Sequence, residues 1–252
     1  MGHSGSTLAK ALAHRLERRY GVGAATIQAH IIPALGGERL FEGGDEVVLD
    51  GSTVSHCVII VEGFAAQYKL LPSGKRQITG ICVPGDIANV GTLFWNRADH
   101  GLVALGSVVV RTIAHDQLRT LMETFPDVRR AICHQLVEDL MLHRERIVSM
   151  GRRTAVEHFA TLICELYWRL LNVEHAHSDG FFLPLTQTDI ADAMGMSTVH
   201  VNRVIKQLRT AGVMRITGQQ VTIVNWQRLC EIAGFRNHSL SAMFPKRGAE
   251  AH

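Results

Sequence analysis

Short apolar runs separated by glycines dominate the chain from residue 31 to about residue 113. The runs, which are rich in β-branched residues, span residues 46–49, 57–61, 65–71, 77–82 and 107–113. Short strands at regular spacing with turn signals between them are typical of an all-β roll or barrel. Residues 71–75 predict a hairpin turn, because Pro72 and Gly74 supply the backbone angles that a tight turn needs.

Helical spacing precedes this region. Leu8, Leu12 and Leu16 lie on one stripe and predict a short helix over residues 8–20. Its other positions are mostly basic: Lys10, His14, Arg15, Arg18 and Arg19. Such a helix can pack on its own domain, or it can lie on a membrane surface or against a partner helix.

A longer helical stretch follows the break at Phe125-Pro126, with Asp127 as its start signal. Its apolar seam recurs at steps of four or three and consists of Val128, Ile132, Leu136, Leu140, His143, Ile147 and Met150. A seam this narrow favours helix-to-helix dimerisation. The alternative is a helix that packs on its own domain.

Residues 185–209 predict two helices joined by a tight turn. Thr186 caps the first helix, with the acidic Asp189 in its first turn. Gly195 occupies the corner, where a positive φ is easiest for glycine. Ser197 caps the second helix, whose buried face is Val201, Val204, Ile205 and Leu208. Residues 213–217 and 220–224 then predict a β-hairpin, which makes the whole segment a winged helix-turn-helix.

The second helix of this motif leaves a polar and basic face outside the core. With Thr186, Gln187 and Ser197 at the helix starts, the expected DNA-binding residues are Thr198, Val199, His200, Asn202, Arg203, Lys206 and Arg209. Arg can bond two guanine acceptors and Asn can bond adenine, whereas the later Lys206 and Arg209 are better placed for phosphates. Winged helices also serve as protein-interaction scaffolds, and that alternative stays open.

The expected fold is therefore α+β. Residues 1–30 form an N-terminal helical extension, 31–126 a β-roll sensor domain (a double-stranded β-helix) and 127–151 a dimerisation helix. Residues 152–235 form the winged helix-turn-helix, and the polar tail 236–252 is expected to be disordered.

This plan resembles the Crp/Fnr family of bacterial transcription regulators over roughly residues 31–234. The helix-turn-helix is the most specific part, and Val83-Pro84-Gly85-Asp86-Ile87 resembles the turn that opens the family's cyclic-nucleotide cassette. The resemblance implies a homodimer that binds a two-fold DNA site and is switched by a signal at the sensor domain. RNA polymerase is a further implied partner if the protein activates transcription.

Two departures from the family pattern change what is expected. Val90, His100 and Gly101 stand where cyclic-AMP receptors place a Glu for the ribose and an Arg-Ser pair for the phosphate. With Arg97 as a nearby substitute, these residues form the candidate ligand pocket. They would leave the buried phosphate of cyclic AMP without its usual Arg and hydroxyl partners, which argues against cyclic AMP as the ligand.

In the recognition helix, Arg203 matches the family's base-reading Arg, whereas Val199 replaces its usual Glu. Val199 offers only apolar contact, for instance to a thymine methyl, so His200 and Asn202 become alternative readers.

Composition and the remaining motifs narrow the alternatives. The net charge is only +3, no apolar run reaches about 18 residues, and no signal segment is evident, so we expect a cytoplasmic protein without a membrane partner. The five cysteines form no Cys-x-x-Cys pair, so we predict neither structural zinc nor a disulfide framework. P-loop, dinucleotide and nucleophile-elbow motifs are absent, which argues against an enzyme.

The signal itself is left open by the sequence. No cofactor is predicted, although an unknown small-molecule effector or haem is possible. Candidate haem or metal ligands are His56, Cys57, His100, His115 and His143. A dimer that is competent without any effector is an equal alternative.

Overall fold

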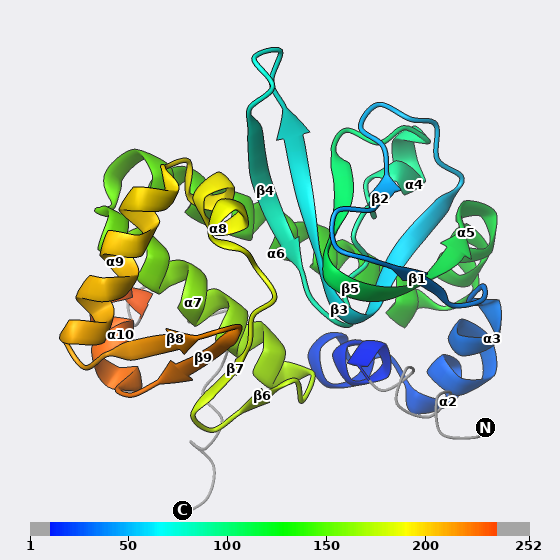
Figure 1. Ribbon diagram of the computed structural model, residues 1–252. Helices are drawn as coiled ribbons and strands as arrows, with labels where there is room; N and C mark the ends of the chain where they lie inside the picture. Colours follow the sequence, from blue (N-terminus) through cyan, green and yellow to red (C-terminus); the bar gives the residue numbers. More distant parts are fainter. Residues whose placement is uncertain (1–10, 236–252) are drawn as a thin grey trace, which may run out of the picture.

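The computed structural model describes residues 11–235 (Figure 1); the expected tail at 236–252 lies outside this range. The β-roll is an antiparallel sheet of β1 (Arg39–Phe41), β2 (Glu46–Val48), β3 (His56–Leu70), β4 (Arg76–Cys82) and β5 (Gly101–Ala114). The strand order is β1-β5-β3-β4, with β2 also paired to β5. A short helix, α4 (Thr92–Trp95), lies between β4 and β5.

Two strands of the β-roll, β3 and β5, are longer than the apolar runs indicate. Two expected strands at 57–61 and 65–71 are one continuous β3, whose register shifts between Glu62 and Phe64. The last strand begins at Gly101 rather than near residue 107, because residues 101–105 pair with β3 from Tyr68 to Phe64. The expected hairpin turn is present: Leu71 N donates to Lys75 O at 2.9 Å, and Gly74 N donates to Leu71 O at 2.9 Å.

The described part of the N-terminal extension, from residue 11 onward, packs on its own domain, while Leu8 and Lys10 of the expected helix lie outside the described residues. Residues 11–14 are α-helical and continue as a π-helix, η1 (Arg15–Arg19). Leu12, Leu16 and Tyr20 are buried in one apolar cluster with the β-roll and the start of the long helix. Helical backbone then continues through α2 (Ala24–Thr26), η2 (Ile27–Ile31) and α3 (Ile32–Ala34), past the expected boundary at residue 30.

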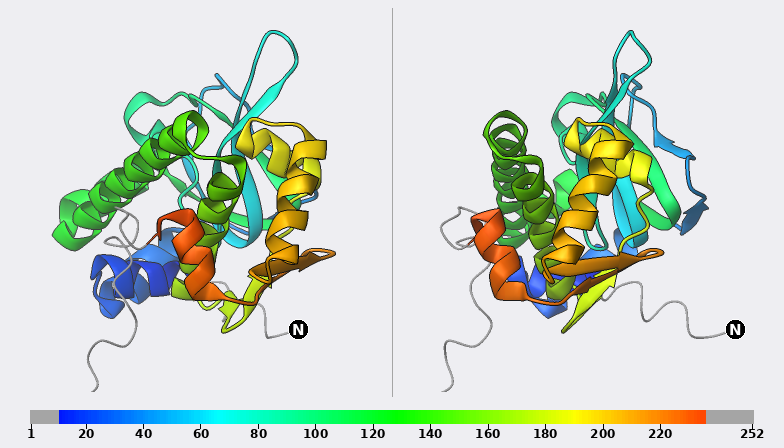
Figure 2. Two further views of the ribbon diagram at one scale, coloured as in Figure 1. Left: turned by 90° about the vertical axis from the view of Figure 1, so that its left-hand side faces the viewer. Right: turned by 60° about the vertical axis from the view of Figure 1, so that its left-hand side comes forward.

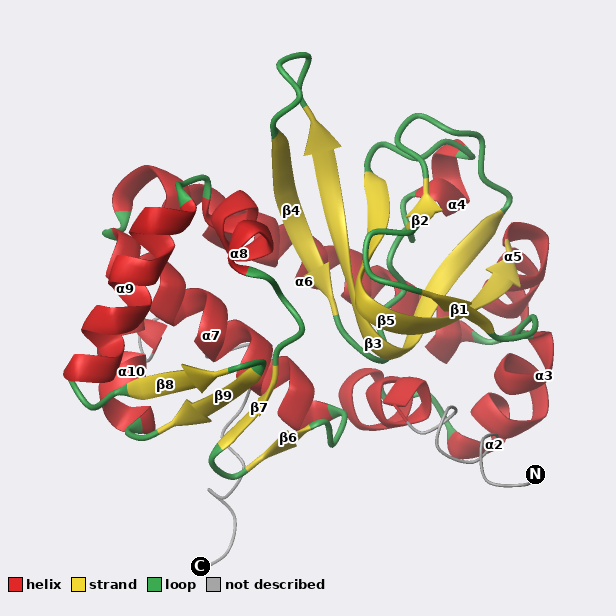
Figure 3. Cartoon of the chain, viewed as in Figure 1, coloured by secondary structure: helices red, strands yellow, loops and turns green. Residues whose placement is uncertain are grey.

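Helices connect the β-roll to a second, smaller unit (Figure 3). The connection runs through α5 (His115–Thr124) and the long α6 (Pro126–Arg152). The second unit contains α7 (Ala155–Asn172), α8 (Gln187–Met194), α9 (Thr198–Thr210) and α10 (Trp226–Ala233). Its sheet has the order β6-β7-β9-β8, from β6 (Ala176–His177), β7 (Gly180–Phe182), β8 (Met214–Thr217) and β9 (Gln220–Ile223). Among residues 11–235, no helix is long and apolar enough to cross a membrane.

The first half of the expected dimer seam on α6 packs within the chain. Val128 and Ile132 are each 3% exposed and pack with the β-roll and the N-terminal extension, and Leu136 lies against the same cluster. Leu140, Ile147 and Met150 are exposed, and His143 is half-buried. The apolar positions do lie on one helix, but their periodicity does not show whether the stripe packs on its own domain or on a partner.

A single apolar core joins the two units. Phe64, Ile78 and Ile81 of the β-roll belong to the same buried cluster as Phe159 and Leu166 of α7. The cluster continues through α8, α9 and the wing strands. The orientation of the helix-turn-helix relative to the β-roll is therefore fixed by packing on both sides of α7.

Candidate nucleic-acid interface

Local hydrogen bonds set the two helices of the helix-turn-helix. Thr186 and Asp189 form a capping box at the start of α8: Asp189 N donates to Thr186 Oγ1 at 3.1 Å, and Thr186 N donates to Asp189 Oδ2 at 2.9 Å. Gly195 ends α8 with a φ of 66°, a left-handed conformation that costs glycine nothing. Ser197 Oγ then accepts from His200 N at 3.3 Å and begins α9.

The expected reading face of α9 lies on the outside of the molecule, with the wing strands β8 and β9 at the end of the helix (Figure 2). The exposed members of the expected DNA-binding set are Thr186, Gln187, Ser197, Val199, His200, Asn202, Arg203, Lys206 and Arg209, and Thr198 is half-buried. Asn202 Nδ2 donates to Gln187 Oε1 at 2.6 Å, which links the two helices at their exposed side. The structure thus brings polar, basic and cap residues onto one open surface.

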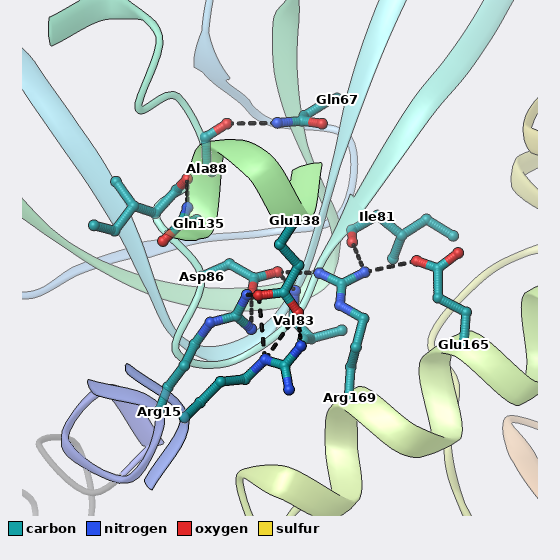
Figure 4. Close-up of polar contacts among 12 residues, drawn as sticks. Arg15, Gln67, Ile81, Val83, Asp86, Ala88, Gln135, Glu138, Glu165 and Arg169 are labelled. Atoms are coloured by element: carbon teal, nitrogen blue, oxygen red, sulfur yellow. Dashed lines mark hydrogen bonds and ion pairs between the residues drawn. The ribbon is translucent and has the colours of Figure 1, made fainter. Parts of the chain in front are cut away.

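A buried ion cluster surrounds the turn at residues 83–87 of the β-roll (Figure 4). The Asp86 carboxylate pairs with Arg15 of the N-terminal extension and with Arg169 of α7. Arg169 Nη1 also donates to Ile81 O and to Glu165 Oε1, each at 2.9 Å. Because both arginines are buried, the carboxylates of Asp86 and Glu165 offset the cost of removing their charges from water.

The N-terminal extension completes this cluster through Glu138 of α6. Arg19 Nε donates to Glu138 Oε1 at 3.0 Å, and the Tyr20 hydroxyl donates to Glu138 Oε2 at 2.7 Å. Burial raises the pKa of Glu138, but the Coulomb attraction of Arg15 and Arg19 and the hydrogen bonds outweigh it and lower this pKa to about 2.

Close packing around the turn also requires a glycine. Gly85 has a φ of 89°, and a Cβ there would lie 3.0 Å from the carbonyl oxygen of Ala11. On the other sides of the turn, Gln135 Nε2 of α6 donates to Ile87 O at 2.8 Å and Gln67 Nε2 of β3 donates to Ala88 O at 2.7 Å. The turn is therefore held by the chain's own side chains and by the extension.

Two family models match the chain: a Crp-like helix-turn-helix domain over residues 157–232 and a cyclic nucleotide-binding domain over residues 38–125. The nitrogen fixation regulation protein FixK of Bradyrhizobium diazoefficiens is 30% identical over 199 residues, covering 79% of this chain and 83% of that protein. The transcriptional activator protein FnrL of Cereibacter sphaeroides is 26% identical over 78% of this chain and 80% of its own length. The structure of FixK2 from Bradyrhizobium japonicum matches 78% of this chain and 96% of that one, with a TM-score of 0.69 and 25% identity.

The chain belongs to the Crp/Fnr family. The resemblance on which the sequence interpretation rests is confirmed, as is the fold of β-roll, long helix and winged helix-turn-helix. The protein is accordingly a transcription regulator with a helix-turn-helix DNA-binding domain.

Within this Crp/Fnr fold, the expected pocket residues have different surroundings. Val90 is 4% exposed and belongs, with Leu93, to the apolar cluster that the β-roll shares with the N-terminal extension and α6. Arg97 is exposed, and half-buried His100 bonds Asp99 and Ala88 O. A Cβ on Gly101 would meet the ring of Tyr68 at 2.3 Å.

Four of the candidate haem or metal ligands, His56, His100, His115 and His143, have hydrogen-bond partners within the chain. Among residues 11–235, no group of three or more His, Cys, Asp or Glu is arranged to hold a metal ion. His115 is buried and bonds Thr92 Oγ1 and Asn96 Oδ1, each at 3.1 Å. Exposed His56 bonds Ser55 Oγ, and His143 Nδ1 donates to Asp139 O at 2.7 Å. Burial raises the pKa of the Cys57 thiol to about 12, which disfavours the thiolate that metals bind.

Sequence reasoning missed the charged residues that connect the two units. Arg169 and Glu165 lie four positions apart in a mostly apolar part of α7, and that pattern is a usable signal for a buried ion pair. Asp86, the second carboxylate that pairs with Arg169, lies 83 positions away in the sequence, and no local pattern indicates this pairing.

Asp139 of α6 lies beside this cluster in a small cavity of about 20 Å³. Burial and the neighbouring Asp86 raise the pKa of Asp139 to about 7, against the opposing effect of Arg15 and Arg169. Asp139 thus differs from Glu138, one position earlier in the sequence, which accepts hydrogen bonds from Arg19 and Tyr20.

The raised pKa of Asp139 makes stability depend on pH. In the unfolded chain this carboxyl is ionised above about pH 4, whereas in the folded protein it keeps its proton until about pH 7. Its stabilising contribution is therefore complete below pH 4 and is lost as the pH rises through 7. Urea unfolding at pH 5 and pH 8 should show a larger fall in the unfolding free energy for wild type than for Asp139→Asn. Equal falls in both proteins would contradict this assignment.

Proposed function

We propose that this protein is a cytoplasmic homodimer that reads a two-fold-symmetric operator with α9 and responds to a signal other than cyclic AMP. The observation that carries the proposal is the open polar and basic face of α9, held by the Ser197 cap and followed by a wing. We assign it no enzymatic role.

The proposed reader divides into base-reading and phosphate-binding residues. Arg203, Asn202 and His200 lie on the first turns of α9, where side chains reach base edges in the major groove. Val199 is 68% exposed, so in the groove it makes apolar contact in place of a carboxylate. Lys206 and Arg209 bind phosphates, with Thr186, Gln187 and Ser197 at helix starts whose free N–H groups favour anions.

The proposed dimer interface is the exposed stripe of α6. Val137, Leu140 and Ile147 are 56%, 49% and 70% exposed, and Val148 adds a fourth apolar side chain beside them. Several exposed apolar side chains on one helix are typical of an interface. Of the expected seam residues, the proposed interface keeps the exposed Leu140, Ile147 and Met150 and adds Val137, whereas Val128 and Ile132 are buried within the chain.

The signal is proposed to be an effector chemically unlike cyclic AMP, or none. Val90, His100 and Gly101 provide no arginine or hydroxyl for a cyclic phosphate, and the Asp86 turn is paired with Arg15 and Arg169. If the protein activates transcription, RNA polymerase is its further partner.

The test of DNA reading is selection from a random duplex pool without added ligand, at two salt concentrations. Wild type should enrich a two-fold site, and Arg203→Ala should lose about 1–3 kcal/mol of specific binding and relax preference at one base pair. The matched control, Lys206→Ala, should weaken all sequences similarly and reduce the salt slope by about one ion.

Three outcomes of the selection would count against these assignments. Unchanged discrimination by Arg203→Ala would contradict its role as a base reader. A sequence-selective loss from Lys206→Ala would contradict its phosphate role. No salt-dependent DNA binding by wild type would favour the protein-interaction scaffold.

The dimer seam has its own prediction. Ile147→Glu places a charge in the proposed interface, so sedimentation at micromolar concentration should show a monomer with an unchanged circular dichroism spectrum. The control, Leu70→Glu, changes another exposed apolar residue at 59% exposure on the β-roll and should leave the dimer intact. A dimer that survives Ile147→Glu would place the interface elsewhere.

A further inference from the structure

The β3–β4 hairpin of the β-roll forms hydrogen bonds and ion pairs with α8, the first helix of the helix-turn-helix. Arg76, at the start of β4, donates from Nη2 to Asp189 Oδ1 at 2.6 Å and from Nε to Asp192 Oδ2 at 2.8 Å. Its neighbour Gln77 donates from Nε2 to the carbonyl oxygen of Asp192 at 2.6 Å. Figure 1 shows β4 running beside α8, so a sensor strand and a DNA-binding helix are in direct polar contact.

One of these bonds involves Asp189, the third residue of α8, which forms the capping box with Thr186. Asp189 uses Oδ2 to cap the helix through Thr186 and Oδ1 to accept from Arg76. The carboxylate is mostly buried, with 12% of its side chain exposed. Arg76 therefore pairs with the carboxylate at the helix start and holds it in position, while Thr186 and Gln187 stay exposed beside it.

The charges on α8 explain why this contact matters for DNA. Residues 187–194 include two carboxylates, Asp189 and Asp192, and no Lys or Arg. Uncompensated carboxylates on a helix that approaches the phosphate backbone oppose binding. Arg76 supplies the compensating charge from a different part of the chain.

We propose that Arg76, assisted by Gln77, is a positioning residue for DNA binding: from the sensor hairpin it neutralises Asp189 and Asp192 and holds α8 in place. This inference rests on the proposed function. It also provides a physical connection to the sensor, because β4 runs from Arg76 to Cys82, directly before the turn that contains Asp86. A displacement of that turn moves the strand that holds α8.

The test measures affinity for the selected operator and its salt dependence. Arg76→Ala should weaken binding roughly tenfold, the size of a typical coupling between two sites. Adding Asp192→Asn to Arg76→Ala should recover most of that loss, because it removes the repulsion that Arg76 offset. Lys75→Ala removes an equal charge from the exposed neighbouring position and should change affinity by no more than about twofold.

Several outcomes would overturn the proposal. Tighter binding by Arg76→Ala would show that the contact restrains the reader. Equal losses of affinity from Arg76→Ala and Lys75→Ala would show that any positive charge at this hairpin has the same effect. Failure of Asp192→Asn to restore binding in Arg76→Ala would show that Arg76 has only a structural role. If Arg76→Ala does not fold, Asp192→Asn alone decides: the proposal expects affinity at least equal to wild type, and a loss contradicts it. Wild type that binds no DNA refutes the proposed function instead.

Discussion

The burial of α7 against both the β-roll and the winged helix is the constraint on which the rest of the structure depends. Phe159, Ile163 and Leu166 are fully buried in a core that also contains Phe64 and Ile81 of the β-roll. Removing this apolar surface from water is the main driving force that keeps the two units together. It also sets where α9 points, since α8 and α9 pack on the same helix.

Polar contacts then select one geometry among those the apolar core would allow. Arg169 reaches from α7 to Asp86, and Arg76 reaches from β4 to α8, so the two ends of β4 are each joined to the DNA-binding unit. Buried ion pairs add little net stability but strongly disfavour arrangements that leave a charge unpaired. The sensor turn, the N-terminal extension and the reader therefore form one connected set of contacts.

The features that could be predicted from the sequence are those with local causes. The Thr186 cap, the Gly195 corner and the Ser197 cap depend on residues within a few positions, and the structure contains all of them. The fold was predictable because strand and helix periods differ. Val128 and Ile132, expected in the dimer seam, are buried within the chain, because a periodic stripe does not identify its partner.

The charged contacts between units were beyond local reasoning. Arg76 and Asp189 lie 113 positions apart, and neither residue type is unusual where it stands. The departures at Val90, His100 and Val199 were visible only against the family pattern. The contacts that hold the turn at residues 83–87 depend on the packing around it, which spacing along the chain does not encode.

Urea unfolding followed by two probes, tryptophan fluorescence and circular dichroism, tests most directly whether the sensor and the DNA-binding unit unfold together. Of the protein's three tryptophans, Trp168 and Trp226 belong to the winged-helix unit, and Trp95 is 83% exposed on α4 of the β-roll. In Trp95→Phe, fluorescence therefore reports the winged helix alone, while far-ultraviolet circular dichroism reports the whole chain. If sensor and reader unfold as one unit, the urea transitions recorded by both probes should superimpose. A fluorescence transition that precedes the dichroism transition would show that the DNA-binding unit unfolds independently, which would contradict a single cooperative unit.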